Sequence, residues 1–291
     1  ERLRSINSGL VYCSISAFGQ NGPYADKPGF DTLGQAMSGL LSVLTDLHDP
    51  KIMGIALSDY VTGLSAGYGI LAGLLQRQKT GEGSKLDTSL LQATLSFVGE
   101  TAAGYLRTGQ VPDRLARVKN AHAFAFPAKD KLPLVIHCSV PEKFWSALLE
   151  ALGRTDLAAD ERFKTREARK ERYAELEREL KPTFATRTRN EWLKKLQEND
   201  VPAAPLYNMA EVLDDPQVKH LDLLEEVEHP KAGKLKFVRS SVNFPNLPID
   251  KTKPPPLLGE QTAALLAELG YDRGEIDRLE SEGVIYLSPH T

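Results

Sequence analysis

The sequence predicts an α/β fold, and three observations support that prediction. Between residues 10 and 100, short runs of β-forming residues alternate with longer segments whose apolar residues recur at helical spacing. A polar stretch with glycine and proline follows at residues 107–120 and separates this part from the rest. The chain has 291 residues, which is enough for two domains of ordinary size. We therefore expect an α/β layer and a second domain.

The overall charge and the cysteines narrow the possible functions. The net charge is −3, so no basic field attracts nucleic acid or acidic lipid, and neither nucleic acid nor a membrane is an expected partner. Cys13 and Cys138 are the only cysteines, and both lie in apolar, strand-like contexts. That pattern suits free thiols in a reducing compartment, either the cytoplasm or, in a eukaryote, the mitochondrial matrix. No cysteines or histidines have the spacing of metal ligands, so no metal site is expected.

The first elements follow from local patterns. Residues 10–18 are rich in β-formers and predict a buried strand, which ends at a Gly-Pro and Asn-Gly loop. Helical spacing predicts a helix at residues 30–44, with Asp31 or Thr32 as its cap. The apolar run at residues 52–58 is typical of another short buried strand.

A glycine-rich helix is predicted to begin at Asp59. The charge-free apolar window at residues 60–75 is shorter than a membrane span and is interpreted as a buried helix. Its glycines each cost about 1 kcal/mol of helix propensity, which indicates close packing against another element. A short strand at residues 85–88 and a helix from Leu90 onward complete the layer.

The second part of the chain continues the mixed pattern. We predict a strand at residues 134–139 and a helix at 141–153, and then a charged segment at 165–184 whose alternating charges indicate a solvated helix face. Residues 190–208 predict a helix, a proline-bounded strand and a turn.

The C-terminal part is predicted to contain short elements and a proline-rich connection. Asn208 is expected to cap a short helix that ends at Pro216, and residues 223–238 are expected to form a two-stranded ribbon. Proline-rich residues 244–262 should run extended before a last helix at 262–271.

Asp59 has two possible interpretations from its surroundings alone. An aspartate between a strand and a helix is most often a cap, because its oxygen accepts from free helix N–H groups. The same helix start also favours an ionised carboxylate that could act as a nucleophile. The glycine loop at residues 79–83 resembles loops that bind phosphate. Phosphate-binding loops open a helix, however, and this loop follows one, so phosphate binding is not favoured. No serine nucleophile elbow, HExxH pair, CxxC pair or GxGxxG fingerprint is present, so Asp59 stays as a candidate by elimination.

Four separated stretches together resemble one family over essentially the whole chain. The segments are SAFGQNGPYADKPGFD (16–31), GIALSDYVTGLSAGYGILAGLLQRQKTGEGSKLDTSLL (54–91), VPAAPLYNMAEVLDDPQV (201–218) and PPPLLGEQTAALLAELGY (254–271). They resemble the class III coenzyme A transferases of the CaiB/BaiF type, a family that includes the formyl-CoA transferases, the succinyl-CoA:dicarboxylate transferases and the α-methylacyl-CoA racemases. Members of the family usually begin with roughly a hundred further residues of α/β domain, and this chain is expected to lack them.

The resemblance implies a mechanism. Asp59 matches the family's nucleophile, which attacks an acyl-CoA thioester to give a mixed anhydride and CoA thiolate, after which the acceptor acid is activated through the same residue. Coenzyme A is thus a substrate, and no permanently bound cofactor is expected. The segment expected to border the CoA chain consists of Lys27, Pro28, Gly29, Phe30 and Asp31, of which Asp31 matches an acidic residue beside the nucleophile.

The resemblance also leaves alternatives open. The racemase branch carries a histidine before the aspartate of its GHD segment, and this chain has Phe30 there, which favours a transferase because a phenyl ring cannot move a proton. The alternatives are a racemase that uses Asp59 as a base and a catalytically silent family member that acts as a partner subunit. Some transferases carry a glycine-rich lid at the start of the small domain; here Asn120, Ala121 and His122 are the candidate replacement. Ser84 and Ala204 stand where the family commonly has Gln and Gly.

The family's architecture implies the domain plan. We expect a Rossmann-like large domain built from both chain ends, with a smaller α/β domain inserted, and an interlocked homodimer that binds acyl-CoA and a carboxylic acid. The expected boundaries are residues 1–105 for the first part of the large domain, 106–120 for a linker, 121–215 for the small domain, 216–240 for a returning ribbon and 241–291 for the C-terminal part of the large domain.

Overall fold

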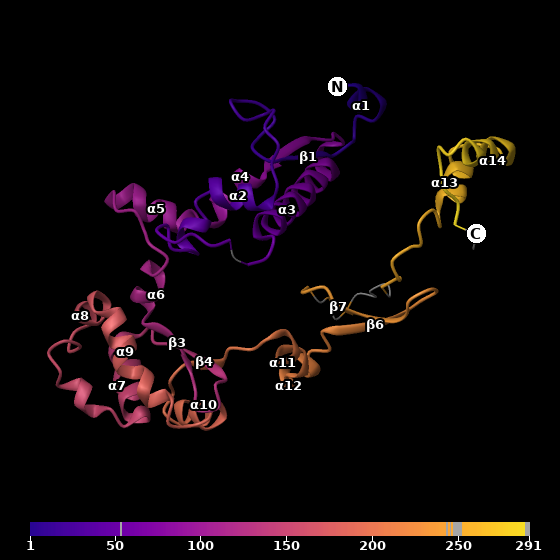
Figure 1. Cartoon of the computed structure of the whole chain (residues 1–291). Coiled ribbons are helices and arrows are strands. Elements are labelled where there is room, and N and C mark those ends of the chain that lie inside the picture. Colours follow the sequence, from indigo (N-terminus) through magenta and orange to yellow (C-terminus); the bar gives the residue numbers. More distant parts are fainter. Residues whose placement is uncertain (53, 243, 245, 247–251, 289–291) are drawn as a thin grey trace. The chain divides into compact units, whose positions relative to one another are not determined.

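The computed structural model describes residues 1–52, 54–242, 244, 246 and 252–288 (Figure 1). The chain divides into two compact units, Glu1–Leu206 and Tyr207–Thr291, and each is described by itself. Both units mix helices with strands, so the predicted α/β class is confirmed. The predicted domain boundaries, and the Rossmann-like arrangement of the large domain, stay predictions.

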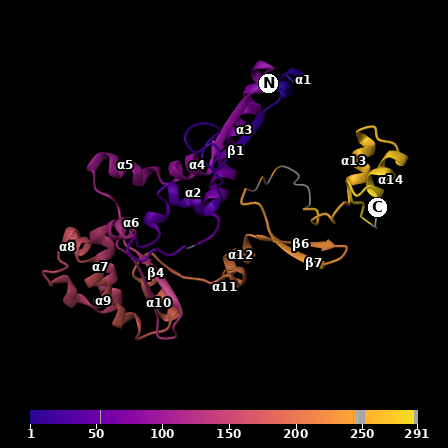
Figure 2. The same ribbon diagram turned by 45° about the horizontal axis from the view of Figure 1, so that its top comes forward.

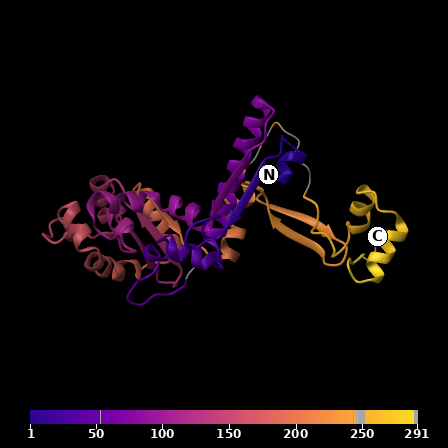
Figure 3. The ribbon, with the colours of Figure 1, turned by 90° about the horizontal axis from the view of Figure 1, so that it is seen from above.

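A parallel strand pair organises the start of the first unit. After α1 (Arg2–Ile6), β1 (Tyr12–Ser16) pairs in parallel with β2 (Lys85–Ser89), with Tyr12 opposite Lys85 and Ser16 opposite Ser89. Both strands lie where the sequence predicts them. The long helix α3 (Leu57–Thr80) is the last element of the connection between them and runs alongside the pair in all three views (Figures 1, 2 and 3). This unit of strand, helix and parallel strand needs such a crossover connection.

Short helices complete this layer. They are α2 (Asp31–Met37), the 3₁₀ turn η1 (Leu41–Val43), α4 (Leu90–Phe97) and α5 (Gly99–Thr108). Ser89 caps α4, because its hydroxyl accepts from the Gln92 N–H at 3.1 Å. Gly34 lets α2 approach its neighbours, since a Cβ at this position would collide with the hydroxyl of Ser58 and lie 2.7 Å from the Cβ of Leu90.

Two predictions for the region before and within α3 are wrong. Residues 54–56 form no strand, and Leu57 already starts the helix; Met53, also in the predicted strand, lies outside the described residues. The window at residues 60–75 is not buried in this chain. The buried face of α3 carries small or hydroxyl-bearing residues, because these allow the strands and α4 to come close, and the large apolar residues point away from them. The buried positions are Ser58, Thr62, Ala66 and Gly73, and the exposed ones include Tyr60, Leu64, Tyr68, Leu71 and Leu75.

The rest of the first unit is a three-stranded antiparallel sheet with helices packed on it. The sheet order is β3 (Ala123–Pro127), β4 (Pro133–His137) and β5 (Ala203–Pro205). The predicted strand at residues 134–139, the helix at 141–153 and the helix and strand within 190–208 are confirmed. The accompanying helices are α6 (Ala116–Ala121), α7 (Pro141–Leu152), the 3₁₀ turn η2 (Thr155–Ala158), α8 (Arg166–Glu171), α9 (Tyr173–Phe184) and α10 (Arg189–Glu198).

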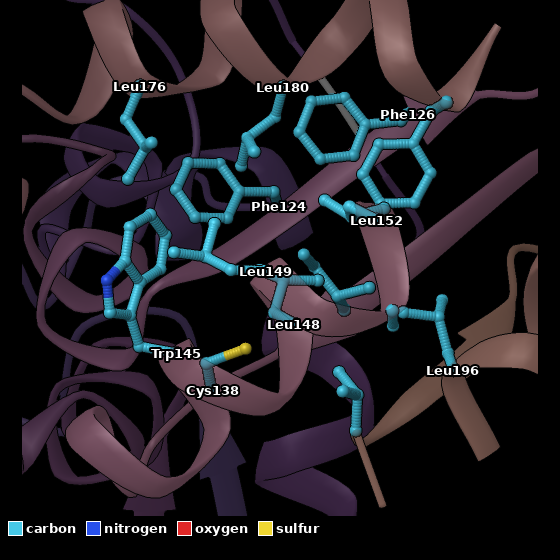
Figure 4. Close-up of a cluster of buried hydrophobic side chains, with 14 of the residues drawn as sticks. Phe124, Phe126, Cys138, Trp145, Leu148, Leu149, Leu152, Leu176, Leu180 and Leu196 are labelled. Carbon is cyan, nitrogen blue, oxygen red and sulfur yellow. The ribbon is translucent and has the colours of Figure 1, made fainter. Parts of the chain in front are cut away.

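The core of this part is aromatic and aliphatic. Figure 4 shows Leu176 and Leu180 pointing from α9 toward the rings of β3. Phe126 stacks on Phe184 with ring centroids 4.4 Å apart, and stacked rings at this spacing add to the stability from burial alone. The charged segment at residues 165–184 therefore has one solvated side, as predicted, and one side that forms the core. Strand β3 was missed, although its alternating phenylalanines have the period of a strand.

The second unit contains short helices and a hairpin. Asn208 caps α11 (Met209–Asp214) through a capping box with Glu211, as predicted from the sequence, and Pro216 begins the next helix. The predicted ribbon is confirmed as an antiparallel pair. Of the proline-rich stretch predicted at 244–262, residues 245 and 247–251 lie outside the described residues. The remaining elements are α12 (Pro216–His220), β6 (Leu224–His229), β7 (Gly233–Val238), α13 (Thr262–Glu268) and α14 (Arg273–Ser281).

The same described residues lack two further features, a helix suited to a membrane and a cluster suited to a metal ion. None of their helices combines the length and the apolar character that a membrane crossing requires. The described part of the chain also holds no group of three or more His, Cys, Asp or Glu side chains arranged to bind a metal ion.

The packing of α2 against α3 and α4 predicts the effect of a methyl group at position 34. We expect Gly34→Ala to lower the free energy of unfolding by about 1–3 kcal/mol, because the added Cβ overlaps Ser58 and Leu90. The control is Gly104→Ala in α5, where a Cβ meets nothing and the gain in helix propensity should stabilise by up to about 1 kcal/mol. Urea unfolding of both variants measures the difference; equal shifts would contradict this packing.

Candidate functional site

The candidate nucleophile lies in the first turn of α3. Asp59 is the third residue of the helix, its side chain is exposed, and its carboxylate has no hydrogen-bond or ion-pair partner in the part of the chain that the structure describes. The residue at the N-cap position is Ala56, and no side chain of α3 itself caps the helix. The interpretation of Asp59 as a helix cap is therefore wrong, and its carboxylate stays available for other chemistry.

A different aspartate caps α3. The carboxylate of Asp31 accepts hydrogen bonds from the backbone N–H groups of Ser58 at 2.8 Å and Asp59 at 3.3 Å. The prediction that Asp31 caps its own helix is wrong. Asp31 is already the first residue of α2, and its side chain bonds to the start of α3. The negative charge of Asp31 at this helix start also complements the helix dipole.

The other N–H groups at this helix start are satisfied too. The N–H of Leu57 donates to the carbonyl of Ile55 at 2.7 Å, and the N–H of Tyr60 donates to the carbonyl of Ala56 at 3.1 Å. A helix start normally leaves such groups without intrahelical partners, and they would be available to an anion. In α3 they are already used, so the first turn holds no free N–H group that could stabilise an oxyanion.

Gln35 holds Asp31 in position. Its side chain is 3% exposed, and its amide nitrogen donates both to the second carboxylate oxygen of Asp31 at 2.6 Å and to the carbonyl of Ile55 at 3.1 Å. The amide oxygen of Gln35 is buried and has no hydrogen-bond partner among the residues that the structure describes. Gln35 thus links α2, the segment before α3 and the capping carboxylate.

Ser58 fixes the opposite side of the same turn. Its fully buried hydroxyl lies 2.7 Å from the hydroxyl of Thr94 and donates to the carbonyl of Leu90 at 3.3 Å, which ties α3 to α4. One turn further, the Thr62 hydroxyl donates to the carbonyl of Ser58 at 2.6 Å. The backbone of Asp59 is thus held by neighbours on two sides, while its carboxylate stays exposed.

The predicted CoA-binding segment leads directly into this arrangement. Lys27 and Pro28 are exposed, and the Lys27 ammonium lies 4.0 Å from the centre of the Tyr24 ring. Gly29 packs against Ala17 so closely that a Cβ would collide with it, and Phe30 is 78% exposed. Asp31, the last member, bonds to the backbone of the turn that carries Asp59. Binding of coenzyme A by this segment stays a prediction.

The other predicted segment lies at the start of the antiparallel sheet. Asn120 and Ala121 end α6; the Asn120 carbonyl accepts from Arg166 at 3.3 Å, and His122 follows in a left-handed conformation with φ 43°. His122 is 4% exposed, and neither ring nitrogen has a hydrogen-bond partner within the described ranges of the chain. The hydrogen bonds and ion pairs of the described residues do not join this segment to Asp59, and its substrate role stays a prediction.

Burial controls the protonation of His122 and Cys138. The pKa of His122 is lowered from 6.5, first by burial and then by the positive charges of Arg169 and Arg166, against smaller opposing effects of the Arg166 backbone and Glu142. Burial raises the pKa of the Cys138 thiol to about 12, so it is not a thiolate nucleophile at neutral pH.

Three residues of these sites were missed in the sequence. Gln35 lies four residues after Asp31, a spacing that places both on one helix face. Ser58 directly precedes Asp59 and looked like an ordinary helix-start residue. Arg169 is fully buried and contacts Trp145 and Glu142, but it sits among exposed charges of similar kind. Only the Gln35 spacing was available as a signal.

Known proteins match the chain over nearly its whole length. The model of CoA-transferase family III matches residues 1–262. Succinyl-CoA:glutarate CoA-transferase of Mus musculus is 34% identical over 292 residues, which cover 98% of this chain and 66% of the mouse protein. Formyl-CoA:oxalate CoA-transferase of Streptomyces avermitilis is 31% identical over 304 residues, which cover 98% of this chain and 74% of that protein. The chain thus spans about two thirds of the length of the mouse relative.

Solved structures share the fold. A CaiB/BaiF family protein from Brucella suis has a TM-score of 0.78 and 31% sequence identity, covering 92% of this chain and 70% of that chain. The protein Rv3272 from M. tuberculosis has a TM-score of 0.75 and 29% identity, covering 90% of this chain and 70% of that one.

The neutral, buried His122 predicts a pH dependence of stability. Because its folded pKa lies below 6.5, the unfolded chain takes up a proton first as the pH falls, so this contribution is present above about pH 6.5 and is lost below it, at up to about 1.4 kcal/mol per pH unit. We expect His122→Asn, which tolerates the left-handed conformation, to make the free energy of unfolding fall less steeply below pH 6.5 than in the wild type.

The matched control is the same substitution at an exposed histidine. His48→Asn should leave the wild-type slope of unfolding free energy against pH unchanged. Urea unfolding at several pH values measures all three proteins. If the free energy of unfolding falls equally steeply with pH in His122→Asn and in the wild type, the neutral state of His122 does not contribute to the pH dependence of stability.

Proposed function

The chain belongs to CoA-transferase family III, and on that premise we propose that it transfers coenzyme A from an acyl-CoA donor to a carboxylic acid acceptor through Asp59. The observation that carries the proposal is the carboxylate of Asp59, which is exposed and has no partner among the described residues, on a backbone turn that Asp31 and Ser58 hold in place. A nucleophile needs both properties, because it must be accessible to the thioester and fixed in direction.

The first step transfers the acyl group to the protein. A carboxylate oxygen of Asp59 attacks the thioester carbonyl carbon, the carbon–sulfur bond breaks, and CoA leaves as a thiolate. The product is a mixed anhydride between Asp59 and the donor acid. The thiolate then attacks the Asp59 carbonyl, which releases the donor carboxylate and leaves CoA bound to Asp59 as a thioester.

The second half repeats these steps with the acceptor. The acceptor carboxylate attacks the Asp59 thioester and forms a new anhydride with release of the thiolate. The thiolate attacks the acceptor's carbonyl, so the new acyl-CoA leaves and the carboxylate of Asp59 is restored. One thioester is consumed and one is formed, and water must be excluded because it would hydrolyse the anhydride.

Two other candidate nucleophiles of the first unit are less suitable. The Cys138 thiol stays protonated because of its burial, and the Asp31 carboxylate is occupied by two backbone N–H groups and by Gln35. Among these groups Asp59 alone combines exposure with a free carboxylate.

The names of the relatives suggest the substrate class. They pair succinyl-CoA with glutarate and formyl-CoA with oxalate. We therefore propose that the acceptor is a small dicarboxylic acid, and succinyl-CoA with glutarate is the first pair to test.

The assembly and the remaining domain plan also belong to this proposal. We propose a homodimer of interlocked chains, in which residues 1–105 and 241–291 contribute to one large domain. The exposed apolar side chains along α3 support a partner surface, since soluble monomers rarely expose large contiguous apolar patches. Asn120, Ala121 and His122 are proposed to contact the acyl group, and the segment from Lys27 to Asp31 is proposed to border the CoA chain.

The central prediction concerns Asp59. With succinyl-CoA, the wild type should form a hydroxylamine-sensitive adduct on Asp59, detectable by mass spectrometry, and Asp59→Asn should lose the adduct and lower CoA transfer to glutarate by more than about 10³-fold. The matched control is Asp87→Asn, which removes an exposed carboxylate of β2 and should retain wild-type transfer. Transfer by Asp59→Asn at the wild-type rate would exclude this mechanism. Absence of both adduct and CoA binding in the wild type would instead indicate a silent partner subunit.

A second prediction separates transferase from racemase chemistry. Racemisation requires an acid and a base at the α-carbon, and the phenyl ring of Phe30 can be neither. We therefore expect α-deuterated 2-methylacyl-CoA to keep its label when it is incubated with the protein. Washout of deuterium into solvent, measured by mass spectrometry, would favour the racemase alternative.

A further inference from the structure

The side chain of Gln35 has only one possible orientation. Its amide nitrogen donates to two acceptors, a carboxylate oxygen of Asp31 at 2.6 Å and the carbonyl of Ile55 at 3.1 Å. Turning the amide over would bring its oxygen against two other oxygens, so both bonds would be lost. The observed orientation leaves the amide oxygen buried, with no partner in the described part of the chain. An unpartnered buried acceptor is costly, which indicates that the two donated bonds serve a purpose beyond satisfying Gln35 itself.

Those two bonds hold the two acceptors, the Asp31 carboxylate and the Ile55 carbonyl, that bind the backbone at the start of α3. Asp31 receives the N–H groups of Ser58 and Asp59, and Ile55 receives the N–H of Leu57 at 2.7 Å. Gln35 is therefore linked to three of the first N–H groups of α3. Asp31 provides the link to two of them, and the carbonyl of Ile55 provides the link to the third. No other described side chain donates to both of these acceptors.

We propose that Gln35 is a positioning residue for the nucleophile, acting through Asp31. Its amide holds the Asp31 carboxylate against the start of α3, so that the first-turn N–H groups are bound by Asp31 and the carboxylate of Asp59 is left without donors. This inference rests on the proposed transfer of CoA through Asp59.

The arrangement affects the nucleophile in two ways. A carboxylate that accepts no hydrogen bond from the protein keeps its electron density for attack, whereas one that folds back onto free helix N–H groups is stabilised and turned away. The fixed backbone also gives Asp59 one direction of approach to a thioester, and a small misplacement of a nucleophile is costly in rate.

The first test measures hydrogen exchange of the backbone amides at the start of α3 and requires no activity measurement. The second and third N–H groups of a helix have no intrahelical acceptor, and among the described residues Asp31 is the acceptor of both Ser58 and Asp59. Loss of this acceptor should therefore appear as faster hydrogen exchange of these two amides. We expect residue-resolved NMR to show both amides protected in the wild type. Gln35→Met, which keeps the side-chain length but removes the donors, should make them exchange at least about tenfold faster.

The matched control is Ser38, which lies at the C-terminal end of α2, about one turn after Gln35. Ser38 is also buried, and the bonds of its hydroxyl to described residues are to the carbonyl of Gln35 and to the N–H of Leu40. Ser38→Ala should leave the exchange of the Ser58 and Asp59 amides at the wild-type rate. Should Gln35→Met not fold, the wild-type measurement still decides, because unprotected amides at both positions overturn the proposal.

The second test separates positioning from binding. Gln35→Met should slow the formation of the hydroxylamine-sensitive Asp59 adduct by at least about tenfold at saturating succinyl-CoA, with the dissociation constant for succinyl-CoA changed by less than about twofold. Adduct formation at the wild-type rate, or exchange unchanged from the wild type, overturns the inference. A wild type that forms no adduct refutes the proposed function instead, and the exchange experiment then decides the role of Gln35 by itself.

Discussion

The N–H groups at the start of α3 impose the constraint on which the rest of the candidate site depends. A helix start leaves these groups without intrahelical partners, and in a packed protein each of them must find an acceptor. Here a carboxylate from another helix provides it, since Asp31 of α2 accepts from Ser58 and Asp59. That bond requires α2 to lie against α3, and α2 can do so because Gly34 has no side chain to collide with Ser58. The cap of α3, the packing of α2 against α3 and the position of the Asp59 backbone therefore depend on one another.

The two halves of the first unit reach stability by different means. Around β3 and β4, rings and leucines fill the interior, and the polar groups there are few and mostly bonded, as with the Trp192 indole that donates to the Phe184 carbonyl at 2.8 Å. Around α3, the contact is made by hydroxyl groups and small residues such as Ser58, Thr62 and Thr94. Hydroxyl contacts are directional, and a directional contact suits a turn whose orientation matters more than its burial.

Local patterns in the sequence predicted most elements but could not assign the capping residue. Strands β1, β2 and β4 and the helix cap at Asn208 depend on neighbours a few residues away, so they could be predicted. The capping aspartate of α3 lies 27 residues before the N–H group it binds, and no local pattern reports such a distance. Sequence reasoning was correct that an aspartate caps this helix and wrong about which one. The apolar run before α3 was mistaken for a strand because apolar residues in an irregular segment have no distinguishing period.

The pairing of β1 with β2 also bears on how fast this layer can fold. Tyr12 and Lys85 become neighbours only after roughly seventy intervening residues have closed into a loop, and the entropy of that closure is lost before the parallel ladder returns any stabilisation. The antiparallel pair β3 and β4 closes a far shorter connection. We therefore expect the sheet that bears no nucleophile to form first and the turn that carries Asp59 to reach its final geometry late, when the long crossover is complete.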